Sequence, residues 1–290
     1  MRVAMLGLGL IGGSIARALA ATGVSRPSVA AWTPAGRGPA SALAAGVIDL
    51  AATSPEAALD GADLVILAAP ASEILGLLGR LAGPWRSALD VDAVLTDVAS
   101  TKGAIVNRAA VLGLRFVGGH PMAGRETNGF AASSAQLLVE RPWVIVPSAD
   151  EAAVGRVEDL ATAVGARPLR MTASDHDSAV AAISHLPLVV AVALVEAVAG
   201  GATGERDDWP TLATLAATGW RDMTRLARGD VAMGAGIGAT NGPEIAARIR
   251  DLMAVLEGWS AALSAPDGPD EAAIAERLRV ARERLIATDP

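Results

Sequence analysis

Short, almost wholly apolar runs alternate with stretches of helical periodicity in the first half of the chain. The runs that read as buried strands are 2–7, 29–32, 64–70, 93–98, 115–119 and 143–147. Between them, apolar residues recur at helical spacing at 14–22, 73–81 and 102–112. Strands that are apolar throughout and alternate with helices are typical of a parallel sheet covered by helices on both faces. The segment 150–171 adds one helix and an edge strand.

The strand pattern stops near residue 172, and helical periodicity continues to the end of the chain. The helices predicted there are 174–200, 208–229, 243–263 and 270–287. They are separated by the glycine- and proline-rich segments "AGGATG", "MGAGIGATNGP" and "SAPDGPD". We therefore predict an α/β fold in two domains. A Rossmann-like, doubly wound, mostly parallel sheet occupies 1–172, and an all-α dimerisation domain occupies 173–290.

The most apolar of these helices, at 179–199, has too few polar residues to form a solvated face. A membrane span is the alternative. His185, Pro187 and Glu196 interrupt the run, however, and a buried helix pair accounts for it at lower cost. We expect this helix to pack against a second copy of the chain, so that the protein is a homodimer through its helical domain.

Composition and charge exclude several classes of partner. The 290 residues are 52% hydrophobic and 19% charged, the balance of a folded chain rather than a disordered one. The net charge is −7 without any basic run, so we expect neither nucleic acid nor a membrane as partner. The lack of cysteine excludes disulfides and thiolate metal ligands, and no metal is expected. Because the N-terminus reads as a strand rather than a signal peptide, we expect a cytoplasmic location.

A glycine-rich loop follows the first predicted strand. The segment "VAMLGLGLIGGS" carries Gly7, Gly9 and Gly12 in the G-x-G-x-x-G pattern, and Leu10 and Ile11 open the next helix. Such glycines allow a tight turn, a backbone approach to a pyrophosphate, and close packing of strand and helix. The helix N-terminus then attracts the phosphate charge. A purely structural glycine turn is the alternative, and the place of the loop in an alternating chain favours a dinucleotide site.

The end of the second predicted strand bears on the choice of dinucleotide. An acidic residue at this point binds the ribose of NAD. Here Thr33 stands at that position and Arg37 follows four residues later. A hydroxyl and a guanidinium accept a 2′-phosphate, which an acid would repel. We therefore expect NADP, with NAD as the alternative if Arg37 points into solvent.

Two further loops follow strands at the same edge of the predicted sheet. "LTDVASTKG" places Asp97, Ser100 and Lys102 after one strand, and "FVGGHPMAGRETNGF" places His120 after the next. Ligands bind at the carboxyl ends of the strands in doubly wound sheets, so both loops should face the nicotinamide, with Asp97 among the cofactor-binding residues. A neutral imidazole can take the proton of a hydroxyl whose carbon loses a hydride, which makes His120 a candidate general base. The alternative is a turn histidine bonded to a local carbonyl.

Five motifs, in this order, resemble those of the prephenate/arogenate dehydrogenase family of tyrosine biosynthesis over essentially the whole chain. They are "GLGLIGGS", "DVASTK", "GGHPMAGRE" followed by Gly129, "SHLP" at 184–187 and "GWRDMTRLA" at 219–227. The resemblance implies an NAD(P)-dependent oxidative decarboxylation of prephenate or arogenate. A hydride leaves for the nicotinamide, and the ring carboxylate leaves as carbon dioxide. Which of the two substrates is used stays open.

The same resemblance implies roles for individual residues. His120 accepts the proton of the ring hydroxyl, and Ser100 bonds that hydroxyl or orients the imidazole. Arg225 pairs with a substrate carboxylate, which its two-donor fork suits. His185 shapes the substrate site, and Glu126 lies near its mouth.

The residues alone leave a structural alternative for most of these roles. Arg221 and Arg225 are four positions apart, so one helix face would hold both, as substrate ligands or as a surface ion-pair ladder. From the residues alone His185 is expected to be a core histidine, and His176 in "SDHDS" an exposed cap residue. Lys102, the single lysine of the chain, lies either near the phosphates or substrate or in solvent at a first helical turn.

Three positions depart from the family pattern. Arg125 replaces a small hydroxyl residue, Trp220 replaces a phenylalanine, and Gly234 falls where a tryptophan is common. We expect the glycine-rich stretch around Gly234 to be looser than in relatives, and we expect Trp143 and Trp220 to serve packing.

Two rival functions remain beside this interpretation. One is another Rossmann dehydrogenase with a helical dimer domain, of the 3-hydroxyacid dehydrogenase or imine reductase type. Such enzymes commonly use a lysine in the helical half, and residues 103–290 contain none. The other is a regulator that senses NADP without turnover, in which Ser100, His120 and Arg225 would serve no purpose.

Overall fold

A six-stranded parallel sheet forms the centre of the N-terminal part of the molecule. The structure is a computed structural model, and it describes residues 1–23, 26–125, 127–201 and 204–288. The strands lie side by side in the order β3 (Leu50–Ala51), β2 (Ser28–Trp32), β1 (Arg2–Leu6), β4 (Leu64–Leu67), β5 (Val94–Asp97) and β6 (Phe116–Val117). Each neighbouring pair is parallel. This is the Rossmann order, and it confirms the predicted fold class.

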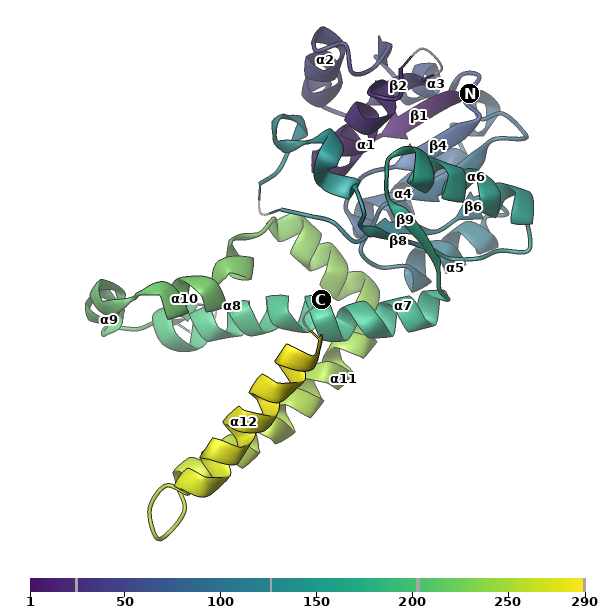
Figure 1. The fold of residues 1–290 in the computed structure, drawn as a ribbon. Helices are drawn as coiled ribbons and strands as arrows, with labels where there is room; N and C mark the ends of the chain where they lie inside the picture. Colours follow the sequence, from purple (N-terminus) through teal and green to yellow (C-terminus); the bar gives the residue numbers. More distant parts are fainter. Residues whose placement is uncertain (24–25, 126, 202–203, 289–290) are drawn as a thin grey trace. The chain divides into compact units, whose positions relative to one another are not determined.

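Helices cover both faces of this sheet (Figure 1). One face carries α1 (Leu10–Ala20), α2 (Arg37–Ala44) and α6 (Glu151–Ala163), and the other carries α3 (Pro55–Leu59), α4 (Ala71–Ala82) and α5 (Gly103–Val111). Alternate residues of β1 divide between the two cores: Val3 and Met5 belong to the first, Ala4 and Leu6 to the second. Burial on both faces explains why the strands are apolar throughout.

A second, smaller sheet departs from the predicted topology. It contains β7 (Gly119–Pro121), β8 (Pro142–Ile145) and β9 (Arg167–Arg170), with β7 antiparallel and β9 parallel to β8. The run predicted as one strand at 115–119 is therefore divided, because the chain leaves the main sheet after Val117. The short elements α2, β3 and α3, and the 3₁₀ turns η1 (Arg86–Ala88), η2 (Phe130–Ala132) and η3 (Ala135–Leu138), were not predicted.

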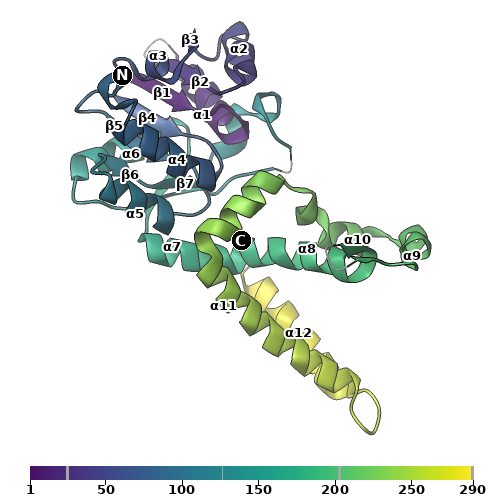
Figure 2. The ribbon, with the colours of Figure 1, turned by 180° about the vertical axis from the view of Figure 1, so that it is seen from behind.

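A long rod of helix follows β9. α7 (Ala173–Val180) continues through a π-helical turn, η4 (Ala181–His185), into α8 (Leu186–Ala199), and both views show them running end to end (Figures 1 and 2). Pro187 has no N–H to donate in the turn after His185, which accounts for the local change of pitch. Among the described residues, Ala173–Ala199 is the one helical stretch long and apolar enough to cross a membrane, and 22% of its most apolar window is buried.

The helix predicted at 208–229 is in fact three short pieces. β10 (Gly200–Gly201) and β11 (Gly204–Glu205) form a small hairpin, and then come α9 (Trp209–Leu215), α10 (Thr218–Met223) and the 3₁₀ turn η5 (Arg225–Arg228). Thr224, with φ −99° and ψ 5°, interrupts the helix between α10 and η5. The prediction that Arg221 and Arg225 share one helix face is therefore wrong. Trp220 packs on Trp209, with ring centroids 5.4 Å apart, as expected for a packing residue.

The glycine-rich stretch that was expected to break the chain is helical. α11 (Val231–Leu263) runs through it and departs from helical geometry at Asn241, where φ is −132° and ψ is 23°, two residues before Pro243. A Cβ at Gly236 would lie 3.4 Å from Ser72 Oγ, so α11 packs at ordinary van der Waals distance on the start of α4. Residues that look like a loop in the sequence thus form a helix that contacts α4.

The described chain divides into two compact units, Met1–Gly242 and Pro243–Pro290. The second unit consists of the remainder of α11 and of α12 (Glu271–Thr288). Within it, the Arg277 guanidinium lies 5.5 Å from the Trp259 ring centroid, and Arg279 pairs with glutamates one turn away on either side. All of the site residues described below belong to the first unit.

Candidate active site

The three motif glycines each meet a different physical demand. Gly7 has φ +104°, and a Cβ there would lie 2.2 Å from the Ala68 carbonyl oxygen. A Cβ at Gly12 would lie 2.9 Å from the Gly7 carbonyl oxygen, so this residue allows α1 to pack on the loop. At Gly9, among the described atoms, nothing lies within 4 Å of such a Cβ. The loop is therefore closely packed against the protein at Gly7 and Gly12 and open at Gly9, as a pyrophosphate-binding loop must be.

The charge of the helix that follows also suits phosphate. α1 begins at Leu10 without an acidic residue in its first turn, and no described side chain caps its N–H groups. Leu10 and Ile11 are both half-buried in that turn. Free N–H groups at a helix N-terminus attract an anion. The residues present therefore fit the phosphates of a dinucleotide.

Thr33 and Arg37 lie beside this loop. Thr33 follows the last residue of β2, and its Oγ1 accepts a hydrogen bond from the Gly36 N–H at 3.1 Å. Arg37 is exposed at the start of α2 and makes no ion pair with any described residue. A Cβ at Gly38 would lie 2.8 Å from the Leu8 carbonyl oxygen, so the start of α2 is pressed against the glycine loop. Arg37 thus begins α2 beside the glycine loop, with its side chain exposed to solvent.

The carboxyl end of β5 holds the backbone immediately before His120. A Cβ at Gly119 would lie 2.7 Å from the Asp97 carbonyl oxygen and 2.9 Å from Trp143 Nε1, so no other residue type fits without a shift. Asp97 Oδ1 accepts from the Gly119 N–H at 3.0 Å, and Lys102 Nζ donates to the Gly119 carbonyl oxygen at 2.7 Å. Both polar groups of the Gly119 backbone are therefore clamped. Trp143 is fully buried beside them, as a packing residue should be.

Asp97 and Lys102 form a fully buried ion pair. Burial raises the pKa of Asp97 and lowers the pKa of Lys102, and in each case the attraction of the partner opposes the shift. The Lys102 side chain has no exposed surface, and its ammonium group donates hydrogen bonds to the Asp97 carboxylate and to the Gly119 carbonyl oxygen. A direct contact of Lys102 with substrate, as predicted, is not what this conformation shows. The residue instead braces the histidine loop.

His120 lies on β7, and its ring meets a second histidine. His120 Nδ1 is 2.8 Å from His176 Nε2, and the two rings lie edge to face with centroids 5.1 Å apart. His176 is 1% exposed, so the prediction of an exposed cap residue is wrong. The helix cap is Thr172, whose Oγ1 accepts from the Asp175 N–H. His120 Nε2 is the ring nitrogen that this contact leaves available.

Asp177 connects the histidine pair to the main domain. Its Oδ1 lies 2.8 Å from His176 Nδ1 and accepts from the Lys102 N–H at 2.7 Å, and its Oδ2 accepts from the Gly103 N–H at 2.7 Å. It thereby caps the N-terminus of α5 from another helix. Burial raises its pKa, but the hydrogen bonds from His176 and the two backbone amides outweigh burial, so the pKa of Asp177 is lowered.

His185 completes the group, so that all three histidines of the chain are gathered in one place. Its side chain is 1% exposed, and its Nδ1 lies 3.2 Å from Asn241 Nδ2, which also donates to the Asp177 carbonyl oxygen at 2.9 Å. His185 Nε2 has no hydrogen-bond partner among the described residues. Burial lowers the pKa of His185 to about 4, against the attraction of Asp177. The imidazole is therefore neutral at neutral pH.

The other predicted residues are more dispersed. Ser100 is half-buried in the turn between β5 and α5, and its hydroxyl makes no hydrogen bond to the described residues. Arg221 and Arg225 are both exposed, at the end of α10 and the start of η5. Glu126 lies outside the described residues. The neighbouring Arg125, one of the departures from the family pattern, is exposed.

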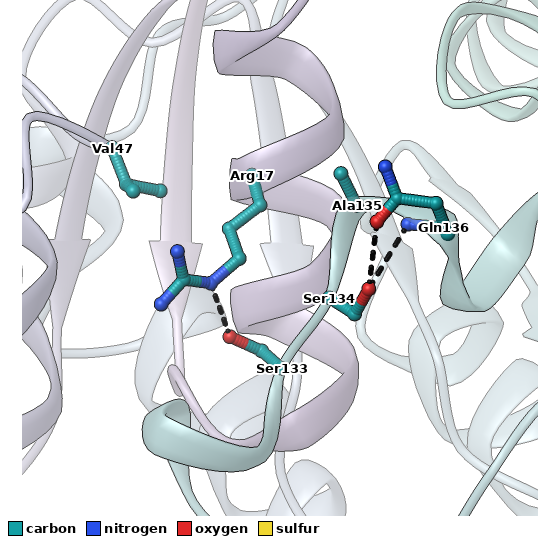
Figure 3. Close-up of a pocket in the computed structure, with 6 residues that line it drawn as sticks. All are labelled: Arg17, Val47, Ser133, Ser134, Ala135 and Gln136. Carbon is teal, nitrogen blue, oxygen red and sulfur yellow. Dashed lines mark hydrogen bonds between the residues drawn. The ribbon is translucent and has the colours of Figure 1, made fainter.

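The chain that follows the histidine loop is anchored on α1 (Figure 3). Arg17 Nε donates to Ser133 Oγ at 2.8 Å, and the guanidinium lies 4.4 Å from the Phe130 ring centroid. A Cβ at Gly13 would meet both Phe130 and Ser133 at 2.9 Å. The open pocket of about 350 Å³ beside them is lined by Arg17, Val47, Ser133, Ser134, Ala135 and Gln136. It lies some two turns of α1 beyond the glycine loop, and we interpret it as a feature of the contacts that attach this segment to α1.

Sequence reasoning assigned no part in the site to His176, Asp177 or Asn241. One signal was available: a chain with three histidines placed one of them beside an acidic residue in "SDHDS". Nothing in the local pattern shows, however, that this turn packs against β7, more than fifty residues away.

The sheet order, the glycine cradle and the polar groups at the strand ends define an α/β nucleotide-binding protein with a separate helical part. Comparison with known proteins gives the family. The family description "Prephenate dehydrogenase, nucleotide-binding domain" matches residues 15–169, and "Prephenate dehydrogenase, dimerization domain" matches residues 172–277. The chain belongs to the prephenate dehydrogenase family. This confirms the resemblance seen in the motifs.

Individual relatives agree with this assignment. The chain is 35% identical to the prephenate dehydrogenase of Bacillus subtilis over 80% of this chain and 62% of that protein. It thus spans less than two thirds of that relative's length. Synechocystis arogenate dehydrogenase has a similar structure, with a TM-score of 0.77 and 29% identity over 98% of this chain and all of that one. Aquifex aeolicus prephenate dehydrogenase, solved with hydroxyphenyl propionate and NAD⁺, has a TM-score of 0.84 and 26% identity over 99% and 98% of the two chains.

Proposed function

We propose that this protein oxidatively decarboxylates prephenate or arogenate, with NAD(P) as the hydride acceptor. The observation that carries the proposal is the setting of His120. A clamped backbone holds it at the carboxyl end of β5, two strands away from the glycine loop of β1. Two strand spacings are about 10 Å, a distance that a dinucleotide spans between its phosphates and its nicotinamide. Family membership supports the same reaction and disfavours both rival functions.

His120 is suited to accept a proton through Nε2. Burial lowers the pKa of His120 well below its usual value, and His176, Lys102 and His185 lower it further. The imidazole is therefore neutral at neutral pH and has a lone pair to offer. A bound oxidised nicotinamide supplies the hydride acceptor. His120 takes the proton of the ring hydroxyl as its carbon is oxidised.

Loss of carbon dioxide then balances the reaction. The electron pair of the bond between ring and carboxylate enters the ring, which becomes aromatic with a phenolate oxygen. The proton held on His120 can return to that oxygen, so the enzyme ends each turnover unchanged. Ser100, half-buried near the end of β5, is the proposed partner of the same hydroxyl.

The proposed substrate ligands come from the helical part of the chain. Arg225 pairs with a substrate carboxylate, and Arg221 is the second candidate; both guanidinium groups lie on exposed surface. His185 bounds the site as a neutral, buried imidazole. Glu126 is proposed for the mouth of the site on the motif alone. An acidic group facing the substrate side chain would favour arogenate, which carries an ammonium where prephenate has a keto group.

NADP is the proposed preference between the two dinucleotides. The exposed Arg37 guanidinium and the Thr33 hydroxyl lie where the second strand ends, and contact of Gly38 with Leu8 holds them near the glycine loop. A 2′-phosphate would find a cation and a hydroxyl there in place of an acid. Asp97 is fully enclosed by protein partners, so its proposed contribution to the cofactor is to position the loop beneath the nicotinamide.

We further propose that 1–172 binds the dinucleotide and that 173–290 supplies the substrate groups and the dimer contact. Large apolar side chains are exposed along the helical half, among them Ile183, Val192, Met253, Val255 and Leu256. A second copy that covers such a surface would remove it from water. We propose a cytoplasmic homodimer without nucleic acid or membrane as partner.

The assay that tests this function follows the absorbance of reduced nicotinamide. Purified protein is incubated with prephenate or arogenate, each with NAD and with NADP. We expect turnover with at least one substrate and a higher kcat/KM with NADP. Absence of turnover in all four combinations would refute the function, and a preference for NAD would refute the assignment of Thr33 and Arg37.

The first prediction concerns the general base. His120→Asn should lower kcat by roughly 10²–10⁴-fold, the usual contribution of a positioned base. Dinucleotide affinity, measured by quenching of protein fluorescence, should stay near the wild-type value because the glycine loop is untouched. Near-normal turnover in this variant would show that another group takes the proton.

A further inference from the structure

We propose that His176 and Asp177 are positioning residues that fix the tautomer of His120 and so leave its Nε2 free to accept a proton. The inference rests on the proposed function, because it concerns the base of that reaction. Its evidence is the chain of contacts from Asp177 through His176 to His120.

The direction of the hydrogen bonds follows from Asp177. Both of its carboxylate oxygens accept backbone N–H groups, from Lys102 and from Gly103, each at 2.7 Å. An ionised carboxylate only accepts hydrogen bonds. The 2.8 Å contact with His176 Nδ1 therefore requires the proton to be on that nitrogen.

The same reasoning carries on to His120. A neutral imidazole has one N–H, so a His176 protonated at Nδ1 has a bare lone pair at Nε2. The 2.8 Å contact between His176 Nε2 and His120 Nδ1 then needs the proton of His120 at Nδ1. His120 Nε2 is consequently the unprotonated nitrogen. When it takes a proton, the Nδ1–H remains bonded to His176, so the cation keeps a partner.

The relay, meaning the hydrogen-bonded series Asp177, His176 and His120, has a second protonation pattern that would disable the base. A doubly protonated His176 would donate from Nε2 to His120 Nδ1, and the single proton of His120 would then lie at Nε2. Among the described residues, Asp177 bonds His176, and Lys102 and His185 are the other titratable groups that act on His120. The proposed setting is the one in which His176 carries a single proton, on the nitrogen that faces the Asp177 carboxylate. The carboxylate thus orients a remote imidazole, as an aspartate does in a catalytic triad.

Four different elements hold the relay in place. His120 lies on β7, His176 and Asp177 lie on α7, and the N–H groups that bind Asp177 begin α5. Asn241 of α11 donates to the Asp177 carbonyl oxygen at 2.9 Å. These contacts leave the carboxylate little freedom to turn away from His176.

Two nearly isosteric substitutions separate positioning from packing. In His176→Gln the side-chain amide oxygen reaches about the place of Nε2 and can accept from His120 Nδ1–H. In His176→Asn the amide reaches the place of Nδ1, so it keeps the bond to Asp177 and loses the one to His120. A role in packing alone predicts similar effects for both.

We expect His176→Asn to lower kcat on the order of 10- to 100-fold, the effect of losing a partner that orients a functional histidine. His176→Gln should keep most of the wild-type kcat. KM should be unchanged in both, because the buried His176 side chain does not reach substrate. Equal kcat values for the two variants would overturn the proposal.

A readout without turnover decides the tautomer directly. Because the chain has three histidines, ¹⁵N-histidine NMR of the full-length protein gives few ring signals to assign. Wild type and His176→Gln should show a protonated Nδ1 and a bare Nε2 at His120, and His176→Asn should show a mixture of tautomers. A wild-type His120 protonated at Nε2 would overturn the relay. If wild type turned over neither substrate, the proposed function would fail while this spectrum still tested the relay.

Discussion

At the residue scale, the site depends on a few polar groups whose positions are set by burial. Asp97 and Lys102 each form a hydrogen bond with the backbone of Gly119, and His120 is the next residue. Removing the pair would free a backbone that must stay within hydrogen-bond reach of substrate. The ammonium group of Lys102, the single lysine of the chain, is thus entirely enclosed by protein.

A pH prediction also belongs to this scale. The pKa of His185 is about 4 in the folded protein against 6.5 as a reference value, so its stabilising contribution is complete above pH 6.5. As the pH falls towards 4, the unfolded chain binds a proton that the folded chain refuses, and stability is lost. The shift corresponds to a loss of roughly 3 kcal/mol.

Urea unfolding between pH 7 and pH 4 tests this contribution. His185→Asn places an amide oxygen near the former Nδ1, where it can accept from Asn241 and cannot titrate. The variant should lose less stability than wild type over that interval. Parallel losses in the two proteins would assign the pH dependence to other groups.

At the scale of elements, Asp177 joins two helices that are distant in sequence. Its carboxylate accepts both N–H groups at the start of α5, where Lys102 is the N-cap residue and its side chain does not cap the helix. α7 is in this way tied to the main sheet domain. α11 also contacts this domain, where Gly236 lies against the start of α4.

Replacing this cap should destabilise the fold measurably. In Asp177→Asn one amide NH₂ must face a backbone N–H, which should lower the free energy of unfolding by about 1–3 kcal/mol. Asp159→Asn on α6 is the control, since Asp159 is an exposed acid within that helix and makes no hydrogen bond or ion pair to a described residue. Its effect should stay within about 0.5 kcal/mol. Equal losses in thermal or urea unfolding would contradict the assignment.

At the scale of the whole molecule, apolar surface is unevenly distributed. Most of the large exposed apolar side chains among the described residues follow residue 172. The sheet domain buries its apolar residues in two cores of its own. The helical half therefore needs a partner, and a second copy of the chain is the proposed one.

Val192→Glu on α8 tests that partner. Val192 is 38% exposed, and a carboxylate at this point should weaken dimerisation at least roughly tenfold, as the loss of an interface contact does. Val111→Glu at the end of α5 makes the same change at a side chain that is 80% exposed on the sheet domain. Light scattering after gel filtration should show monomer for the first and an unchanged dimer for the second. An intact Val192→Glu dimer would place the interface elsewhere.

Local pattern alone was enough for the main parallel sheet and for the histidine that follows its strands, but not for the second sheet, in which β7 is antiparallel to β8. Alternating apolar runs gave the order and type of the main strands, and Gly7, Gly9 and Gly12 gave the cradle, because those features depend on residues close together in the chain. The short elements α2, β3 and α3 escaped, since too few residues carry any periodicity.

What only the tertiary structure decided is how distant residues meet. The sequence by itself determined the sheet, the glycine loop and the candidacy of His120, each through a local backbone requirement. The grouping of His120, His176 and Asp177 required the packing of β7, α7 and α5, which no local pattern encodes. Burial also changed the meaning of single residues: Lys102 became a brace and His176 a buried partner, because the cost of an unpaired polar group in the interior makes each one bond to whatever lies beside it.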